Sequence, residues 1–390
     1  MDIREEHTLK RFILIALMFS TFSTYPSSIV SSISLLELGE AFNQPIGVIA
    51  QIRSIAFVVA LFSALIIGAL SVRVNPKTIL LMGLLLLSIS ALGSGASINL
   101  LMLFSFFSLS GMGTAMVEPM INTIIGEHFN PRERARTLGL TAAAGGLSFI
   151  LGGYIVNMYV SLGGWRLAFL GYAMLLPLIA LLFSAKIIPG SGSGALTRSE
   201  MSDAFKAIFS NRSALGCLIG NLFSSASVQG LYFYSFSFLR DNFVLSSFSA
   251  ASVYSISSVF FFVGSYFSGR LVNSFGRKNA LIFSLLFISL STILYTNILY
   301  PLVSILFILL GYFFCALQYS SSNGLSLEQT PRFRGTMMSL NSSAMYVGYT
   351  LGTGLGGYVL LQLNWNFFGV FLGLAALIAA MIIFLLTVDL

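Results

Sequence analysis

Apolar runs of about 20 residues recur along the whole chain, each bounded by charged or other polar residues or by Gly and Pro. A helix of about 20 residues rises roughly 30 Å, which is the thickness of the hydrocarbon core of a bilayer. The pattern predicts twelve membrane-spanning helices, near residues 11–36, 46–71, 78–97, 100–126, 138–160, 166–188, 213–238, 248–270, 279–297, 300–326, 335–361 and 367–388. We therefore expect an all-α membrane protein with little mass outside the bilayer.

The composition excludes the main classes of water-soluble protein. Only 8% of the residues are charged and 56% are hydrophobic, whereas about 25% of the residues of a soluble domain are charged. The two histidines, His7 and His128, lie at the ends of apolar runs, and the two cysteines, Cys217 and Cys315, lie inside such runs. This placement suggests no metal site, disulfide framework or catalytic triad. We expect neither an enzyme nor a nucleic-acid-binding protein, and no cofactor.

The basic residues indicate the orientation of the chain in the membrane. With twelve spans, both termini lie on one side, and the loops of that side contain 17 of the 20 Lys and Arg residues. The opposite loops contain Arg166 and Arg240, and Arg53 lies inside a span. Because cytoplasmic loops are enriched in Lys and Arg, we expect a multi-pass protein of the cytoplasmic membrane with both termini inside the cell. The net charge of +7 then reflects orientation and not an acidic partner.

The two halves of the chain repeat one another. The segment that begins at Gly111 matches the segment that begins at Gly311, with an offset of 200 residues and no gap. Loop segments that begin at Gly68 and Gly269 match with an offset of 201 residues. Each offset corresponds to six spans, an even number, so both halves have the same orientation. We predict two pseudo-symmetric six-helix bundles, residues 1–188 and 213–390.

The connection between the predicted bundles, residues 189–212, combines a flexible segment with a helix-forming one. The sequence GSGSG at 190–194 is typical of a flexible linker. Thr197 and Glu200 then have the spacing of a capping box, and one helical face carries Met201, Ala204, Phe205, Ile208 and Phe209. This pattern predicts a short amphipathic helix on the cytoplasmic membrane surface. A simple tether between the bundles is an equally good interpretation.

The spans, the repeat and the two loop segments together resemble the major facilitator superfamily over essentially the whole chain. The loops GALSVRVNPK and GRLVNSFGRK are similar to that family's G-x-x-x-D-R/K-x-G-R-K/R motif, but neither has the acidic residue. The resemblance implies that these loops close a cytoplasmic gate and that the gate lacks part of its charge interactions here. The predicted gating residues are Gly68, Arg73, Lys77, Gly269, Asn273, Gly276, Arg277 and Lys278.

Three further segments resemble motifs of the same family. Pro119 and the two glycines before it match its R-x-x-x-G-x-G…P motif, with Phe107 in place of the arginine. A Gly-Gly pair at 152–153 matches the end of the antiporter motif, although Phe149 stands where proline is expected. The stretch from Arg334 is similar to the drug/proton antiporter and sugar-efflux branches. The resemblance therefore implies an alternating-access transporter and favours export.

Glu118 differs from the other acidic residues because it falls well inside a predicted span. It lies five residues from the centre of the span 100–126, about 7–8 Å toward the cytoplasm. The repeat places Gln318 at the equivalent position, and the resemblance implies that both face a central cavity lined by spans 1, 4, 7 and 10. Burial favours the neutral form of a carboxyl, so Glu118 could bind and release a proton as its exposure alternates. In the alternative, a protonated Glu118 is bonded within its own bundle and stabilises the kink at Pro119.

Other polar residues fall on the helix faces that the predicted cavity would use. Each could instead serve helix packing, because Ser and Asn commonly form hydrogen bonds between transmembrane helices. The candidate cavity residues, besides Glu118 and Gln318, are Asn122, Tyr25, Ser28, Asn221, Gln229, Tyr232, Asn341 and Tyr346. These residues would make a cavity that is polar, aromatic and nearly uncharged, which suits a neutral, weakly cationic or amphipathic solute.

Arg53 is the second ionisable residue inside a predicted span, about 8 Å to the outside of the centre. It could bind an anionic group on the outward side, but we favour a side chain that extends to the outer interface or pairs structurally within the protein. The leading hypothesis is a monomeric secondary transporter that exports a small organic solute in exchange for protons. One alternative is a symporter or uniporter that binds a small organic anion through Arg53. A second alternative is a receptor or scaffold that transports nothing.

Overall fold

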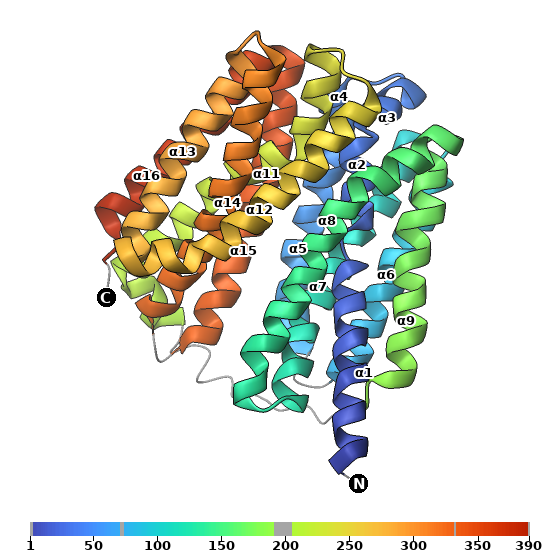
Figure 1. The fold of residues 1–390 in the computed structure, drawn as a ribbon, viewed down its shortest axis with the longest axis vertical. Coiled ribbons are helices and arrows are strands. Elements are labelled where there is room, and N and C mark those ends of the chain that lie inside the picture. The colour runs from blue at the N-terminus through green and yellow to red at the C-terminus, as the bar shows by residue number, and fades with distance from the viewer. Residues whose placement is uncertain (1–2, 71–73, 191–204, 331–332, 389–390) are drawn as a thin grey trace. The chain divides into compact units, whose positions relative to one another are not determined.

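The computed structural model describes residues 3–70, 74–190, 205–330 and 333–388, and these residues contain helices and no strands (Figure 1). Up to residue 190 the helices are α1 (Ile3–Phe22), α2 (Pro26–Ile33), α3 (Leu35–Phe42), α4 (Ile46–Ile49), α5 (Gln51–Leu70), α6 (Pro76–Gly95), α7 (Leu100–His128), α8 (Pro131–Ala168), the π-helix η1 (Phe169–Met174) and α9 (Leu175–Ile187). The later ones are α11 (Arg212–Asn242), α12 (Ser247–Phe275), α13 (Arg277–Asn297), α14 (Pro301–Gln329), α15 (Arg334–Gln362) and α16 (Trp365–Leu386).

Among the described residues, ten helical segments are long and apolar enough to span a membrane, and twelve were expected. One of the ten, Arg136–Ile187, has 52 residues and would be about 78 Å long as a straight helix, far more than one crossing needs. Its backbone leaves the helical conformation at Gly163 and Gly164, so this segment contains the fifth and sixth predicted spans. The eleventh predicted span is the 29-residue helix α15, whose many Gly, Ser and Thr residues keep it outside the ten. The count of twelve crossings stays a prediction.

Contacts between Cα atoms divide the chain into two compact units. The first unit comprises Met1–Asn43 and Ile55–Ala195, and the second comprises Gln44–Ser54 and Leu196–Leu390. The division near residue 195 falls inside the predicted connection 189–212. The placement of residues 44–54 with the second unit differs from the expected bundles, and α5 therefore begins in the second unit and continues in the first.

Residues 44–54 belong to the second unit because their backbone approaches α15 closely. A Cβ atom added to Gly47 would lie 2.2 Å from the carbonyl oxygen of Gly357, so these two backbones touch. The Gln51 side-chain amide donates to the carbonyl of Gly354 over 3.0 Å. The hydroxyl groups of Ser54 and Thr353 lie 2.8 Å apart. Glycine at the contact and polar groups beside it are the usual means by which transmembrane helices pack.

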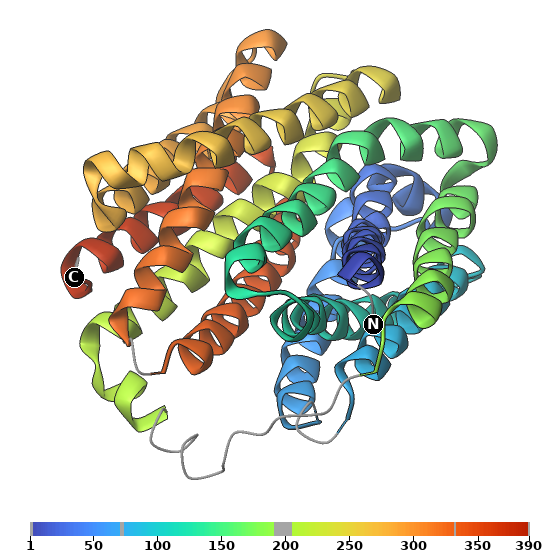
Figure 2. The same ribbon diagram turned by 60° about the horizontal axis from the view of Figure 1, so that its bottom comes forward.

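The same pairs of helices pack together in the two units. In the first unit α6 contacts α7 and α9, and α1 contacts α8 and α9; Figure 2 looks nearly along α1, with α7, α8 and α9 around it. In the second unit α13 contacts α14 and α16, and α11 contacts α15 and α16. Each pair of the second unit is the repeat equivalent of a pair of the first. The internal packing thus follows the sequence repeat.

Glycines let the helices of the second unit approach closely, as the spacing of Gly348, Gly352 and Gly356 predicts. An added Cβ atom would lie 2.2 Å from the carbonyl oxygen of Leu222 at Gly348, and 2.1 Å from that of Ala226 at Gly352. Such distances leave no room for a side chain between α15 and α11. Gly348 and Gly352 therefore serve the packing of α15 on α11.

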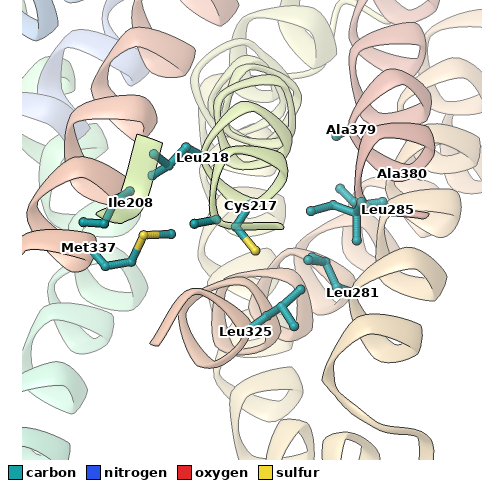
Figure 3. Packing of buried hydrophobic residues seen from close by; sticks show 11 residues of the cluster. Ile208, Cys217, Leu218, Leu281, Leu285, Leu325, Met337, Ala379 and Ala380 are labelled. Atoms are coloured by element: carbon teal, nitrogen blue, oxygen red, sulfur yellow. The ribbon is translucent and has the colours of Figure 1, made fainter. Parts of the chain in front are cut away.

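A buried apolar cluster lies where the predicted linker meets the second unit. Residues 205–210 form a short helix, and its Ile208 is fully buried beside Met337 (Figure 3). Phe205 and Phe209 are partly or largely exposed, and their rings stack at a centroid distance of 6.3 Å. Ile208 thus attaches this helix to the protein core. Thr197 and Glu200 of the predicted capping box lie outside the described residues.

Candidate functional site

The first predicted span is broken near its middle. α1 ends at Phe22, three residues in turn or bend conformation follow, and α2 begins at Pro26. Pro26 has no backbone N–H, so it cannot donate to the carbonyl four residues earlier, and the helical ladder stops. At the end of α1, the hydroxyls of Thr21 and of Thr24 in the following turn donate to carbonyls four residues earlier, at 2.9 Å each. Broken helices expose backbone polar groups inside the membrane, and transporters use such breaks at binding sites.

Tyr25, at this break, donates a hydrogen bond from its hydroxyl to Glu118 Oε1 over 3.0 Å. Glu118 lies in α7 directly before Pro119, which is inside that helix and interrupts its own hydrogen-bond ladder. The side chain of Glu118 is half-buried, and Tyr25 is half-buried as well. The interruptions of two helices therefore meet at one carboxyl group. An ionisable residue inside a membrane span is a candidate functional site by default.

Gln318, the predicted counterpart of Glu118, has the equivalent interaction in the second unit. Its side-chain amide donates to the hydroxyl of Ser224 in α11 over 2.9 Å. With the repeat offset of 200 residues, Tyr25 corresponds to residue 225, one position from Ser224. In both units, then, a polar side chain of the fourth predicted span (α7 or α14) forms a hydrogen bond with the first predicted span of the same unit (α1–α2 or α11). The first unit has a carboxyl there and the second has an amide, so only the first can titrate.

A buried hydrogen-bond network occupies the second unit one turn away from Gln318. The Asn221 amide donates to the side-chain oxygen of Asn341 over 3.0 Å, and the Asn341 amide donates to Asn323 Oδ1 over 3.0 Å. The hydroxyls of Ser322 and Ser326 donate to Asn221 and Asn341 at 3.3 and 3.2 Å. These side chains satisfy one another and join α11, α14 and α15. The geometry therefore favours the packing interpretation for Asn221 and Asn341.

The remaining candidate residues lie in three kinds of surroundings. Asn122, one turn after Glu118 in α7, is exposed, and Ser28 in α2 is half-buried. Tyr232 packs its ring against Tyr312 with centroids 4.6 Å apart. Gln229 and Tyr346 are both buried, at 6% and 7% exposure. Among the described candidates of the first unit, Tyr25 is the one with a direct hydrogen bond to Glu118.

The guanidinium group of Arg53 faces an aromatic ring of α11 in the second unit. Its guanidinium carbon lies 5.6 Å from the centroid of the Phe233 ring, a cation–π distance. Tyr254 and Tyr349 are close enough to interact with it electrostatically. This contact favours structural pairing within the protein for the guanidinium group of Arg53. The aromatic rings of α11, which the sequence pattern alone does not orient, provide the attraction.

The second loop motif is held by charges and carbonyl groups of its own unit. Arg277 Nη1 lies 2.6 Å from Glu328 Oε1 and donates to the Gly324 carbonyl over 2.8 Å. Lys278 donates to two carbonyls at the end of α16, over 2.7 and 3.0 Å. Gly276, at φ 80°, makes the turn between α12 and α13. Glu328 thus supplies Arg277 with an acidic partner from α14, although the loop itself has Asn273 at the position of the motif's acid.

The first loop motif is only partly within the described residues. Lys77 donates from its ammonium group to the Ala185 carbonyl over 2.8 Å. Arg73 lies outside the described residues. Gly269 of the second loop is exposed, with open space around it. Among the described residues, no group of three or more His, Cys, Asp or Glu side chains could hold a metal ion.

Several residues of these networks are not evident from the sequence. Ser224, Ser322 and Ser326 belong to a chain rich in serine, so no spacing distinguishes them from serines that bond only their own helix. The break in the first span has a clearer signal, because Pro26 follows a run of hydroxyl residues in the middle of an apolar segment. Glu328 is similarly detectable, since it lies close to the loop basic residues in the predicted topology.

Comparison with known proteins determines the family. The sequence profile of the Major Facilitator Superfamily matches residues 13–311 and 221–389. The chain belongs to this superfamily. An uncharacterized MFS-type transporter of Bacillus subtilis, YceJ, is 28% identical over 334 residues, which is 82% of this chain and 81% of that protein. The methylenomycin A resistance protein of Bacillus subtilis is 35% identical over 104 residues, 26% of this chain and 22% of that protein.

The fold is that of solved superfamily transporters. The nucleoside transporter NupG superposes with a TM-score of 0.80 at 17% identity, covering 96% of this chain and 99% of that chain. At this identity the likeness concerns the fold alone. The superfamily's members among the relatives and fold neighbours are transporters and not enzymes. The protein is therefore a multi-pass membrane transporter, as the resemblance implied.

Proposed function

We propose that the protein is a secondary active transporter that exports a small organic solute across the cytoplasmic membrane in exchange for protons, by alternating access of the site. Glu118 is the proton site. The hydrogen bond between Tyr25 and Glu118 carries the proposal, because it places an ionisable group where two interrupted helices meet inside the bilayer. Gln318 at the equivalent position gives the second unit the same contact without a titrating group.

Three further features of the proposal follow from the sequence pattern and the relatives. The drug-resistance name of one relative favours export. The candidate residues are polar and aromatic, which favours a neutral, weakly cationic or amphipathic solute. The distribution of Lys and Arg favours termini in the cytoplasm. We expect the transporter to act as a monomer.

Solute flux in proteoliposomes tests the proposal. A thermal-shift screen of the purified protein against chemically diverse solutes first selects a ligand. A transporter then shows saturable uptake of labelled solute, and this uptake is stimulated by unlabelled solute on the opposite side of the membrane (counterflow). A receptor or scaffold shows no uptake. With protons as the coupled ion, a pH gradient alone drives uphill solute movement in the wild type and not in Glu118→Gln. Uphill movement that survives in Glu118→Gln contradicts the role of Glu118.

A symporter or uniporter for a small organic anion is the second candidate, and the surroundings of Arg53 favour it. The guanidinium group faces aromatic rings of the second unit, an arrangement that can bind a carboxylate beside an apolar body. Arg53→Ala distinguishes the two candidates. Loss of transport of an anionic solute with unchanged transport of neutral solutes supports the second candidate, and unchanged transport of all solutes refutes it.

A further inference from the structure

We infer that Tyr25 is a positioning residue that sets the proton affinity of Glu118, and that Gly145 and Phe149 of α8 form the seat that holds its ring in place. This inference rests on the proposed role of Glu118 as the proton site. Its starting observation is that the hydroxyl of Tyr25 donates to Glu118 Oε1 over 3.0 Å. A hydrogen bond donated to a carboxylate stabilises the charged form relative to the protonated one. This bond therefore contributes, beside burial, to the proton affinity of Glu118.

The ring of Tyr25 is fixed from the side of α8. Its centroid lies 4.9 Å from the centroid of the Phe149 ring, with the two planes tilted by 44°. One turn earlier on α8, a Cβ atom added to Gly145 would lie 3.0 Å from Tyr25 Cε2. The absence of a side chain at Gly145 thus leaves the space in which the tyrosine ring lies. The two residues hold the ring from adjacent turns of one helix face.

This seat gives a physical account of Phe149. In the family's antiporter motif, to which this segment is similar, proline is expected at that position. A phenylalanine there supplies an aromatic face for Tyr25 that proline lacks. The backbone of α8 stays helical at this point, since its non-helical residues are Gly163 and Gly164. The departure from the motif therefore exchanges a helix-bending residue for a contact with Tyr25, the hydrogen-bond donor to Glu118.

The neighbouring helices of the first unit place few other ionisable groups near Glu118. The part of α5 in this unit, Ile55–Leu70, carries none, and the one in α6 is Lys77 in the first turn, bonded to the Ala185 carbonyl. The ionisable residues of α1 all precede Phe12, those in the first turns of α8 precede Thr137, and Lys10 lies 3.8 Å from Glu133. Within α8 itself the ionisable residues further along the span are Tyr154, Tyr159 and Arg166. The group that forms a direct hydrogen bond with the Glu118 carboxyl is instead the hydroxyl of Tyr25.

The test is an infrared pH titration of the full-length protein in lipid, which needs no substrate. The carbonyl band of the protonated Glu118 carboxyl is identified by its loss in Glu118→Gln. Tyr25→Phe removes only the hydroxyl, and we expect it to shift the midpoint of this titration by about one pH unit, a tenfold change in proton affinity. An unchanged midpoint in Tyr25→Phe, or a Glu118 band that does not titrate while the protein stays folded, overturns the inference.

A pair of adjacent glycines provides the control for the seat. Gly145→Ala pushes on the ring and changes the midpoint, whereas Gly146→Ala, with nothing within 4 Å of its added Cβ, leaves the midpoint unchanged. In the Tyr25→Phe background, Gly145→Ala has no further effect, because it acts through the hydroxyl. If Gly145→Ala shifts the midpoint equally in the wild type and in Tyr25→Phe, the proposed role of Gly145 in positioning the Tyr25 hydroxyl is refuted. Proton-coupled flux can fail while these shifts occur, so failure of the proposed function is distinguishable.

Discussion

Replacement of Gly352 by alanine tests the close packing of α15 on α11. An alanine Cβ would lie 2.1 Å from the carbonyl oxygen of Ala226 and 2.9 Å from its carbonyl carbon. Close carbon–oxygen contacts between helices are about 3.3 Å, so the two backbones must separate by roughly 1 Å. Backbone atoms lie on both sides of the contact, and neither can rotate away. We expect the overpacking to cost about 1–3 kcal/mol, only partly offset by the better helix propensity of alanine.

Gly146→Ala is the matched control, since its added Cβ meets nothing within 4 Å in the helix α8. There the substitution brings only the propensity gain, up to about 1 kcal/mol. Because the propensity gain is common to both variants, they should differ by the overpacking cost of about 1–3 kcal/mol, which corresponds to roughly 2–12 °C in unfolding temperature for a domain of about 200 residues. The assay is thermal unfolding of both variants in one detergent at one heating rate. If Gly352→Ala melts at or above Gly146→Ala, the close approach of these helices is wrong.

The other predictions concern polar contacts. Removal of the acidic partner of Arg277 by Glu328→Gln weakens a 2.6 Å ion pair; we expect slower transport with a loss of stability of about 1 kcal/mol or less, because both side chains are partly exposed. Lys10→Gln breaks a 3.8 Å pair whose acid, Glu133, is 40% exposed, so the unfolding temperature should not change measurably. Asn341→Ala leaves buried partners of its amide unsatisfied and should destabilise the second unit by about 1–3 kcal/mol in chemical or thermal unfolding. A drop in stability for Lys10→Gln as large as that for Asn341→Ala would contradict the ranking by burial.

Much of the helical architecture could be predicted because apolar run length and loop residues are local properties of the sequence. The offset of 200 residues also predicted that Glu118 and Gln318 occupy equivalent positions of the repeat. Each forms a hydrogen bond with the first span of its own unit. The placement of residues 44–54 could not be predicted, since it depends on the distant Gly357. A small residue permits a close approach but does not specify its partner.

The roles of the polar residues were less predictable than their depth. Asn221 and Asn341 have the positions of cavity residues, yet they bond one another and two serines. The direction of Arg53 depended on the ring of Phe233, which a helical stripe does not orient. Helix periodicity gives the face on which a side chain starts, whereas the end of a long side chain is decided by its neighbours.

Proton release on solute binding is the measurement that tests the central claim most directly. Purified protein in weakly buffered detergent solution, with a pH-indicator dye, receives the solute that the thermal-shift screen selects. Exchange at Glu118 predicts release of about half a proton per bound solute by the wild type at the midpoint of the Glu118 titration, rising toward about one at lower pH. The Glu118→Gln variant should bind the solute and release none. Equal proton release from the wild type and from Glu118→Gln would contradict the account.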